Sequence, residues 1–443
     1  MVGGGVAGLQ VADILAEDGH ECHIFEREAS VGGVWRRNYV GYALQVPMEL
    51  YEFPGMPLRE NDGTFPDGPA VLEYIQAYVQ ERDLTNRCSF HFEESVHKMT
   101  HDDEWKVQTS KDSYSFDFCV ICTGMYNTPH VPFASDKTIH SSEFVDPSVV
   151  VDKHVAVVGA GKSAIDCAVV AAKYASSVTL MSRKMHWPVP RYIAGIVPFK
   201  WGTYSRLGHF LLPPHWDVSP TERALHRAFG WLKWCVWRLL ERVFSFQFGL
   251  DTLPSTPLEV DLFNGGQILT TEFRDAVDAK KIKLEPFSEA AFDADVVISA
   301  TGFTKDYTVF DVETRSKLDV QDDGLWLYKN ILPPRVSRLA FIGSEVSTFN
   351  NILTHYVQAQ WLKHVLKNDS PSPVEMELAV KREREWKRSW MPHTTSRAAL
   401  LQLHMTKYHD ILMRDMNRKL VRHSVWEWIL PHTARDYYKV LLA

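Results

Sequence analysis

The chain has 443 residues, of which 45% are hydrophobic and 23% charged, so it can bury the cores of two or three domains. A formal net charge of −7 argues against nucleic acid as the main partner. Six cysteines in this length are typical of an intracellular chain with free thiols, and no apolar run reaches the ~18 residues of a membrane span. These features together predict a cytoplasmic protein.

The first element is a glycine-rich loop, Gly3-x-Gly5-x-x-Gly8, followed by a helical pattern up to Gly19. A short apolar strand then ends at Glu26. In dinucleotide-binding loops the glycines permit a tight turn, close approach of the backbone to a pyrophosphate, and packing of the helix on the sheet. An acid about 20 residues later binds a ribose hydroxyl. Loop, helix, strand and acid in this order predict a nucleotide site.

Only Met1 and Val2 stand before this loop, where a Rossmann sheet has its central first strand. The second glycine loop of the chain instead follows a full apolar strand, His154 to Val158. This contrast leads us to expect that the printed chain lacks most of its first strand, which would weaken nucleotide binding.

A pair of glycines and a tryptophan follow the first acid, in the stretch SVGGVWRR. Gly33 permits close backbone approach, and the ring of Trp35 is flat enough to pack beside an aromatic cofactor. Further on, one buried apolar strand runs into Thr123-Gly124 and a similar strand runs into Thr301-Gly302. Strand followed by Thr-Gly at both places predicts two chain crossings between nucleotide domains, with cofactor contacts at each.

Cys119-x-x-Cys122 lies within the first of these apolar strands. Positions i and i+3 of a strand point to opposite faces, whereas a redox dithiol sits at a helix start, where the pKa of a thiol is lowered. The pattern therefore favours two core cysteines, and a dithiol reductase is the alternative.

The second glycine loop, Gly159-x-Gly161-x-x-Ala164, lies between an apolar strand and a helix, as the first loop does. Its next strand ends in Ser182 and Arg183 instead of an acid. A carboxylate at this place favours NAD, whereas an arginine can bind the 2′-phosphate of NADP; a solvated basic turn is the alternative. Different strand-end charges imply two nucleotides, FAD at the acid-ended site and NADPH at the base-ended one.

An aromatic segment, 185–255, interrupts the second nucleotide domain. It places Trp231, Trp234 and Trp237 at three-residue spacing among lysines and arginines. A helix packed on the body or on a homodimer face is one interpretation. Tryptophan beside basic residues is also what a membrane interface favours, so peripheral contact with an intracellular membrane is the other.

We therefore predict an α/β fold with two Rossmann-type dinucleotide-binding domains, an aromatic helical insertion and a helical C-terminal tail. The expected limits are 1–145 for the first part of the FAD domain, 150–305 for the NADPH domain with its insertion at 185–255, 306–370 for a return to the FAD domain, and 371–443 for the tail. Gly343 ends a strand in the returning part, which we expect to close over the flavin.

Taken in order, these motifs resemble the class B flavin-containing monooxygenases over essentially the whole chain. The resemblance rests on both glycine loops, on Glu26 and Arg183 at the strand ends, and on the phrases GGVW and ATGF. Between the loops the chain keeps His140 and Phe144 of the family's linker motif. The phrases LQVPMELYEFPGMP and MHWPVPRY are similar to the plant branch that includes the pipecolic acid N-hydroxylase.

The resemblance implies an NADPH- and oxygen-dependent flavin monooxygenase. Such an enzyme oxygenates a soft nucleophile, the nitrogen of an amine or the sulfur of a thioether, through a flavin hydroperoxide. His140 and Thr301 are the positioning candidates, and no metal site is expected. The expected cofactor contacts are Gly3, Gly5, Gly8, Glu26, Gly33, Trp35, Gln45, Val96, Thr123, Gly124, Gly159, Gly161, Ala164, Arg183, Thr301, Gly302 and Gly343.

The chain departs from the family at Pro47, where many members carry an asparagine that contacts flavin and nicotinamide. This departure puts the usual mode of NADP⁺ binding in question. An NADPH oxidase or a pseudoenzyme flavoprotein is therefore a further alternative.

Overall fold

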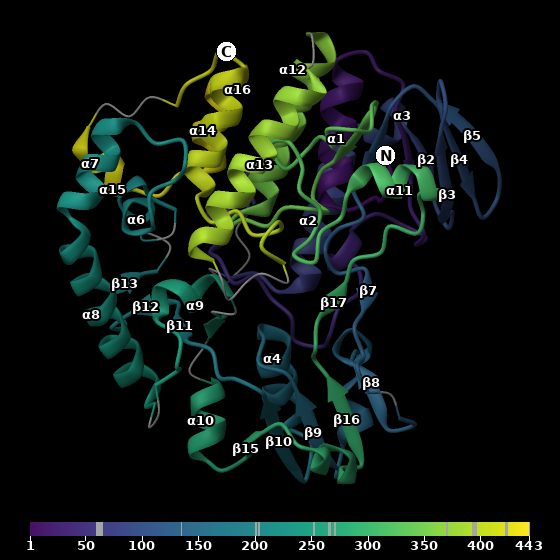
Figure 1. The fold of residues 1–443 in the computed structure, drawn as a ribbon. Coiled ribbons are helices and arrows are strands. Elements are labelled where there is room, and N and C mark those ends of the chain that lie inside the picture. The colour runs from purple at the N-terminus through teal and green to yellow at the C-terminus, as the bar shows by residue number, and fades with distance from the viewer. Residues whose placement is uncertain are drawn as a thin grey trace.

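The computed structural model describes residues 1–443 apart from 59–64, 134, 200–201, 203, 251–252, 265–266, 270–271, 369–370, 392–396, 421–423 and 443. Two parallel sheets, each beside a glycine loop and a helix, form the frame of the molecule (Figure 1). This arrangement confirms the predicted α/β class with two Rossmann-type units.

The first sheet is assembled from short strands that are far apart in the chain. Its spatial order is β2 (Ser89–His91), β1 (His23–Phe25), Val2, β6 (Cys119–Ile121) and β18 (Leu339–Phe341), all parallel. Val2 pairs with both neighbours. On the β6 side its N–H donates to the Val120 carbonyl and its carbonyl accepts from the Cys122 N–H; on the β1 side the Phe25 N–H donates to the Met1 carbonyl and the Gly3 N–H to the Phe25 carbonyl. The residues before the first glycine loop therefore lie at the centre of this sheet, and β18 returns to it from the 306–370 part of the chain.

Helices α1 (Val6–Glu17) and α12 (Asn351–Lys367) pack against each other over this sheet. Leu9, Val11 and Ala12 of α1 have no exposed surface. A parallel sheet is covered on both faces, which is why its strands are continuously apolar.

The second sheet is a parallel sheet of five strands at the lower end of Figure 1. Its spatial order is β15 (Ile282–Pro286), β10 (Ser177–Ser182), β9 (His154–Val158), β16 (Val296–Ser299) and β8 (Thr138–His140). Helices α4 (Lys162–Ala171) and α10 (Glu272–Asp278) flank it. The second glycine loop joins the central strand, β9, to α4.

Two chain segments connect the sheets and pair with each other. β7 (Thr128–Pro129) follows the first Thr-Gly motif, β17 (Phe303–Thr304) follows the second, and they form a short antiparallel ladder. Figure 1 shows them side by side between the upper body and the lower sheet. We call this pair of segments the crossing.

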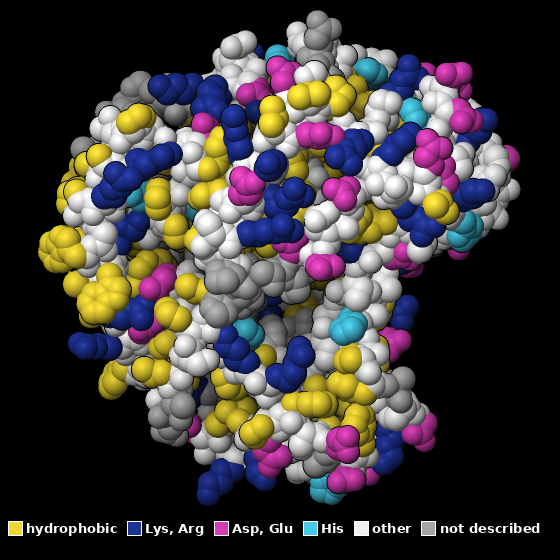
Figure 2. Space-filling view, in the orientation of Figure 1, with side chains coloured by type: hydrophobic (Ala, Val, Ile, Leu, Met, Phe, Trp, Pro, Cys, Tyr) yellow, Lys and Arg dark blue, Asp and Glu magenta, His cyan; other side chains and the backbone are white. Residues whose placement is uncertain are grey.

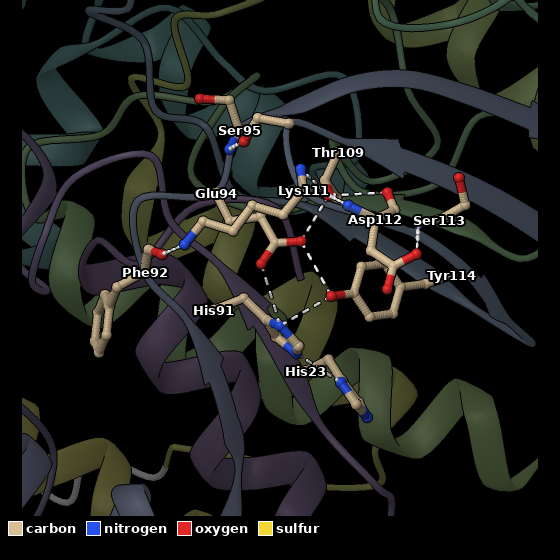
Figure 3. A network of polar contacts seen from close by, with 11 residues as sticks. His23, His91, Phe92, Glu94, Ser95, Thr109, Lys111, Asp112, Ser113 and Tyr114 are labelled. Atoms are coloured by element: carbon tan, nitrogen blue, oxygen red, sulfur yellow. Dashed lines mark hydrogen bonds and ion pairs between the residues drawn. The ribbon is translucent and has the colours of Figure 1, made fainter.

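An antiparallel meander is joined to the first sheet by a partly buried polar network (Figure 3). The meander consists of β3 (Val96–His101), β4 (Trp105–Thr109) and β5 (Ser113–Phe116). Glu94 lies between the two parts: its carboxylate accepts from Thr109 at 2.6 Å and from the Tyr114 hydroxyl at 3.1 Å, and lies 3.5 Å from His91. Because His91 ends β2 and stacks on Phe25, this network supports the strand end that carries Glu26.

The remaining described α-helices and strands complete the molecule. They are α2 (Gly68–Glu81), α3 (Leu84–Arg87), β11 (Pro188–Pro190), β12 (Tyr192–Ile193), β13 (Val197–Pro198), α6 (Arg206–Leu211), α7 (Pro220–Ala228), α8 (Gly230–Phe248), α9 (Leu258–Asn264), β14 (Gln267–Leu269), α11 (Val312–Leu318), α13 (Pro373–Trp390), α14 (Met405–Asp415), α15 (Val425–Ile429) and α16 (Ala434–Leu442). The insertion docks on the tail, where Arg206 contacts Asp410 and the Trp386 indole donates to the Pro214 carbonyl.

The three tryptophans of α8 do not share one face. Trp231 and Trp234 are 69% and 60% exposed, whereas Trp237 is 8% exposed and lies in the core of the insertion. Three residues advance a helix by about 300°, so two such steps place Trp237 about 120° around from Trp231. No helix in the described part of the chain combines the length and apolarity that crossing a bilayer requires.

Candidate functional site

The first glycine loop is packed too tightly for side chains at two of its three glycines. Gly3 has a φ of 110°, and a Cβ there would lie 2.5 Å from the Cys122 carbonyl oxygen. A Cβ on Gly8 would approach the Gly3 carbonyl oxygen within 3.0 Å, a separation that real Cβ atoms essentially never show. Gly5 is the N-cap of α1 and no side chain caps the helix, so the amides of its first turn are available to a phosphate.

The predicted ribose acid, Glu26, stands beside this loop. Its Oε2 accepts from the Gly4 N–H at 2.7 Å and its Oε1 from the Glu28 N–H at 3.0 Å. The side chain is 6% exposed, and the backbone N–H donates to the His91 carbonyl of β2. The carboxylate is therefore fixed at the carboxyl end of β1, the edge of the sheet at which nucleotides bind.

The GGVW phrase folds onto the same loop. Gly33 has a φ of 55° and opens η1 (Gly33–Trp35); a Cβ there would lie 3.1 Å from the Cα of Gly5. The Trp35 indole donates to the Tyr51 hydroxyl at 3.1 Å and packs against Tyr42. Burial raises the pKa of Tyr51, so its hydroxyl stays protonated. Tyr51 was not predicted, because its segment has no regular period.

A half-buried lysine at the carboxyl ends of β6 and β18 was also missed. Lys305 Nζ donates to the carbonyls of Gly124, at 2.9 Å, and Ser344, and lies 3.3 Å from Glu345 Oε1. The Tyr307 hydroxyl donates to Glu345 Oε2 at 2.8 Å. We call Lys305, Tyr307 and Glu345 the clasp; it ties the segment after β17 to both strand ends of the first sheet.

The charges of the clasp are stabilised by each other. Glu345 is 3% exposed, and burial raises its pKa while it lowers the pKa of Lys305. An ammonium group has three N–H donors, and here three acceptors meet them, so the charged form of Lys305 is satisfied. A lysine placed just after a buried strand and a Thr-Gly motif is the sequence signal that could have found it.

A further unpredicted residue, His355 of α12, lies against Gly343. The ring is 7% exposed, and neither nitrogen has a hydrogen-bond partner among the described residues. A Cβ on Gly343 would lie 3.2 Å from Nε2 of this ring and within 3.0 Å of the Cβ of Ala7. Burial lowers the pKa of His355 to about 4, so the imidazole is neutral. A buried imidazole without a partner, next to the start of α1, fits a bound polar group.

The second glycine loop resembles the first in that its first glycine has no room for a side chain. Gly159 has a φ of 149°, and a Cβ there would approach the Ala300 carbonyl oxygen within 3.0 Å. Gly161, the N-cap of α4, has no protein atom within 4 Å of its Cβ position. Ala164 is fully buried beneath the loop. Arg183, directly after β10, is exposed and makes no hydrogen bond or ion pair with the described residues.

The two positioning candidates lie at the crossing and bond to its backbone. His140 Nε2–H donates to the Gly302 carbonyl at 3.0 Å, and its Nδ1 accepts from the Ser142 N–H at 3.2 Å. Thr301 donates to the His130 carbonyl. Burial lowers the pKa of His140, so the neutral ring holds the crossing in place.

Two of the predicted cofactor contacts, Gln45 and Val96, take no part in the interactions described above. Gln45 is exposed, and Val96 starts β3, where it packs on the cluster of Trp105 and Phe310. Thr123 is exposed after β6, next to Gly124, whose carbonyl accepts from Lys305 of the clasp. Their roles as cofactor contacts stay predictions.

The cysteine pair is placed as the strand pattern predicted. Cys119 lies in the cluster of Trp105 and Phe310, whereas Cys122 lies in the cluster beneath α1. Both thiols are unpaired, and burial raises the pKa of each to about 12. A thiol without thiolate character is a poor redox nucleophile, which disfavours the dithiol reductase.

The residues of both loops fit the nucleotides expected from the sequence. At the first site the uncapped α1, the fixed carboxylate of Glu26 and the unpartnered His355 suit a pyrophosphate joined to a ribose. At the second site the open Gly161 and the exposed Arg183 suit a nucleotide with an additional phosphate.

Comparisons with known proteins agree with this geometry. The sequence model of the family described as flavin-binding monooxygenase-like matches residues 1–422. Human flavin-containing monooxygenase 1 is 28% identical, and the match covers 95% of this chain and 83% of that protein.

Solved structures share the fold over most or all of the chain. S-allyl-L-cysteine S-oxygenase from Allium sativum has a TM-score of 0.63 at 18% identity and covers 100% of this chain and 91% of its own. The OTEMO complex with FAD and NADP has a TM-score of 0.69 at 18% identity, covering 94% and 97%. At such identities the likeness shows the fold alone.

Proposed function

The chain belongs to the flavin-binding monooxygenase-like family and is a flavin-dependent monooxygenase, and on that premise we propose that it uses FAD and NADPH to transfer one oxygen atom from dioxygen to a small amine or thioether. The observation that carries the proposal is the pair of glycine loops with opposite strand-end charges, Glu26 at one and Arg183 at the other. The flavin-containing monooxygenase relatives support this class of reaction.

The residues of the chain bind and orient the two nucleotides. Gly5 and the first turn of α1 would hold the FAD pyrophosphate, and Glu26 its ribose; Gly161 and Arg183 would hold NADPH. Bound flavin, once reduced, supplies the activation of dioxygen. His140 and Thr301 tie the crossing together through the Gly302 and His130 carbonyls, and the clasp ties the segment after β17 to the edge of the first sheet.

The test is oxygen-dependent NADPH consumption, screened across amines, amino acids and thioethers with identification of the product. The proposal expects at least one acceptor to stimulate consumption and to incorporate labelled oxygen from dioxygen. NADPH consumption that yields only hydrogen peroxide would support the oxidase alternative, which is motivated by Pro47. Bound flavin that NADPH fails to reduce would support the pseudoenzyme alternative.

Arg183→Ala is expected to narrow the preference for NADPH over NADH. A hydrogen bond to a charged group contributes about 1.5–3 kcal/mol, so the ratio of kcat/KM values should fall about tenfold or more. The exposed Arg315→Ala on α11 is the control and should leave the ratio unchanged. An unaltered ratio in Arg183→Ala would remove this residue from the site.

The exposed face of α8 supports a peripheral membrane contact. Figure 2 shows hydrophobic side chains gathered over this helix at the left edge of the molecule. Trp231, Trp234 and Phe246 are each at least 60% exposed, and the exposed Arg242 lies on the same helix. Tryptophan beside arginine is the pattern that membrane interfaces favour.

Replacing Trp231 and Trp234 together by serine is expected to abolish sedimentation with anionic phospholipid vesicles at low salt. The native protein should sediment with them and be released by salt, because its arginines are screened. Tyr174→Ser, which changes an exposed aromatic residue outside the insertion, should behave as the native protein does. The result that would contradict membrane contact is native protein that stays in the supernatant. If that protein also forms a dimer, and the double variant does not, the exposed face of α8 belongs to a homodimer interface.

A further inference from the structure

We propose that Cys22 and Cys88 form a dithiol that a hydroperoxide oxidises to a disulfide, and that this link holds the starts of β1 and β2 together. The inference goes beyond the proposed function, because it depends neither on the acceptor nor on how either nucleotide is bound. It concerns two cysteines that the sequence analysis did not pair, and Cys119 and Cys122 take no part in it.

The register of the first sheet places the two cysteines side by side. β1 and β2 are parallel with His23 opposite Ser89, so Cys22 and Cys88 directly precede paired residues. The Ser89 N–H donates to the Cys22 carbonyl at 2.8 Å, which continues the ladder to this point. Neighbouring strands lie about 4.8 Å apart, within the Cα separations of about 4.4–6.8 Å that disulfides span.

The two side chains enter the same core. Both are buried in the cluster beneath α1, and both thiols are free. The Cys88 thiol hydrogen-bonds to Cys22, and Cys88 Sγ lies 3.9 Å from the Ala12 carbonyl oxygen of α1. A disulfide therefore forms between two sulfurs that are already hydrogen-bonded, and neither strand has to change its register.

Cys22 differs from the other buried cysteines in its electrostatic surroundings. The hydrogen bond with Cys88 lowers the pKa of Cys22 although burial opposes this effect. The Arg87 guanidinium also lowers it, and Glu21 opposes it more weakly. For the three buried cysteines outside the pair, burial raises the pKa. Since the thiolate is the form that reacts with peroxides, Cys22 is the attacking sulfur of the pair.

The oxidation takes two displacement steps. The Cys22 sulfur attacks one oxygen of hydrogen peroxide, the O–O bond breaks, and a sulfenic acid forms while the other oxygen leaves as water with the thiol proton. The Cys88 sulfur then attacks the Cys22 sulfur, the S–O bond breaks, and the hydroxyl leaves as a second water with the Cys88 proton. Two thiols are oxidised, and one peroxide is reduced to two waters.

The hydrogen bond between the thiols also sets the order of these steps. It is the chief cause that raises the pKa of Cys88, so Cys88 keeps its proton while Cys22 reacts. A neutral sulfenic sulfur is a weaker acceptor than a thiolate, and the Cys88 proton is then easier to remove. The resulting link joins the strand that carries Glu26 to its neighbour, and it restricts the unfolded chain between the two cysteines.

The experiment treats the FAD-loaded Cys235→Ser protein with hydrogen peroxide and maps its cysteines by mass spectrometry after alkylation in denaturant. Cys235 is the exposed cysteine, so its removal prevents links between molecules. We expect a peptide link between Cys22 and Cys88, with the loss of two hydrogen atoms, and a higher thermal midpoint, all reversed by dithiothreitol. The link should form about tenfold or more faster than the other buried thiols are lost.

Three variants in the same background separate the roles of the two sulfurs. Cys22→Ser should form no link and leave Cys88 unmodified. Cys88→Ser should accumulate a sulfenic acid at Cys22, which dimedone traps. Cys167→Ser removes a buried cysteine of the second unit and is the matched control, which should form the link as before. The mapping of the Cys235→Ser protein itself requires no substitution in the pair.

The proposal would be overturned if Cys22 and Cys88 stayed free in Cys235→Ser at a peroxide dose that modifies Cys235 of the native chain. A link that forms no faster than the other buried thiols react would overturn it as well. A link that leaves the thermal midpoint unchanged would show that it does not hold the two strands together.

Discussion

Gly8→Ala is expected to yield a protein that retains no FAD and unfolds at a lower temperature. The new Cβ would approach the carbonyl oxygen of Gly3 within 3.0 Å, and that oxygen belongs to the backbone of a loop that is itself packed on Cys122. No flexible side chain is there to move aside, so either α1 or the loop must shift. Overpacking a core costs about 1–3 kcal/mol even where side chains can adjust, and here the cost includes the shape of the nucleotide site.

Gly5→Ala provides the matched variant within the same loop. Its Cβ would lie 3.6 Å from the Cα of Gly33, an ordinary contact, and its backbone is already extended. This variant should keep the melting temperature of the apoprotein but bind FAD more weakly, because the methyl group occupies the path of the pyrophosphate. The two readouts are the flavin-to-protein absorbance ratio and the thermal midpoint. Equal flavin content in native protein and Gly8→Ala would show that the loop is not the FAD site.

The parts of the site that the sequence predicted are those for which backbone geometry leaves few choices. The loop turns at Gly3 and packs against its own helix at Gly8, so neither position has room for a side chain. This requirement is visible in the sequence as a fixed spacing of glycines. Glu26 was predicted because dinucleotide folds carry an acid at the strand end that lies at a fixed distance from such a loop, and the structure places it beside Gly4. The same logic located Gly159 and Arg183, which lie around the second loop.

The parts that were missed depend on contacts between distant segments. Lys305 finds its partners at Gly124 and Glu345, which are separated from it by 181 and 40 positions. His355 becomes a candidate for the site only in the folded protein, where it lies against Gly343, which in turn packs on Ala7. Which face of α8 is exposed was also not predicted, because three-residue spacing alone does not indicate which side of a helix packs against the rest of the protein.

Lys305→Met is expected to destabilise the protein by about 3–5 kcal/mol, the usual cost of removing one partner of a buried ion pair. The change leaves the Glu345 carboxylate with the Tyr307 hydroxyl as its remaining partner in the clasp, and it leaves the carbonyls of Gly124 and Ser344 without this donor. Since these carbonyls belong to the strand ends that carry the first nucleotide site, FAD retention should fall as well. The exposed Lys106→Met, whose partner Asp102 is also exposed, should change stability little.

The pH dependence of Lys305→Met separates a lost ion pair from lost packing. Burial already raises the pKa of Glu345, and Lys305 is the charge that opposes this shift, so the variant raises that pKa further. When the pKa of a carboxyl group is higher in the folded than in the unfolded state, the free energy of unfolding of the protein falls as pH rises from the unfolded-state pKa to the folded-state pKa. Lys305→Met should therefore be destabilised more at about pH 8 than at about pH 5. Adding Glu345→Gln should recover part of the stability and remove this dependence, because no buried charge remains to be ionised. If thermal midpoints of Lys305→Met and Lys106→Met were equal at both pH values, the clasp would contribute nothing to the fold.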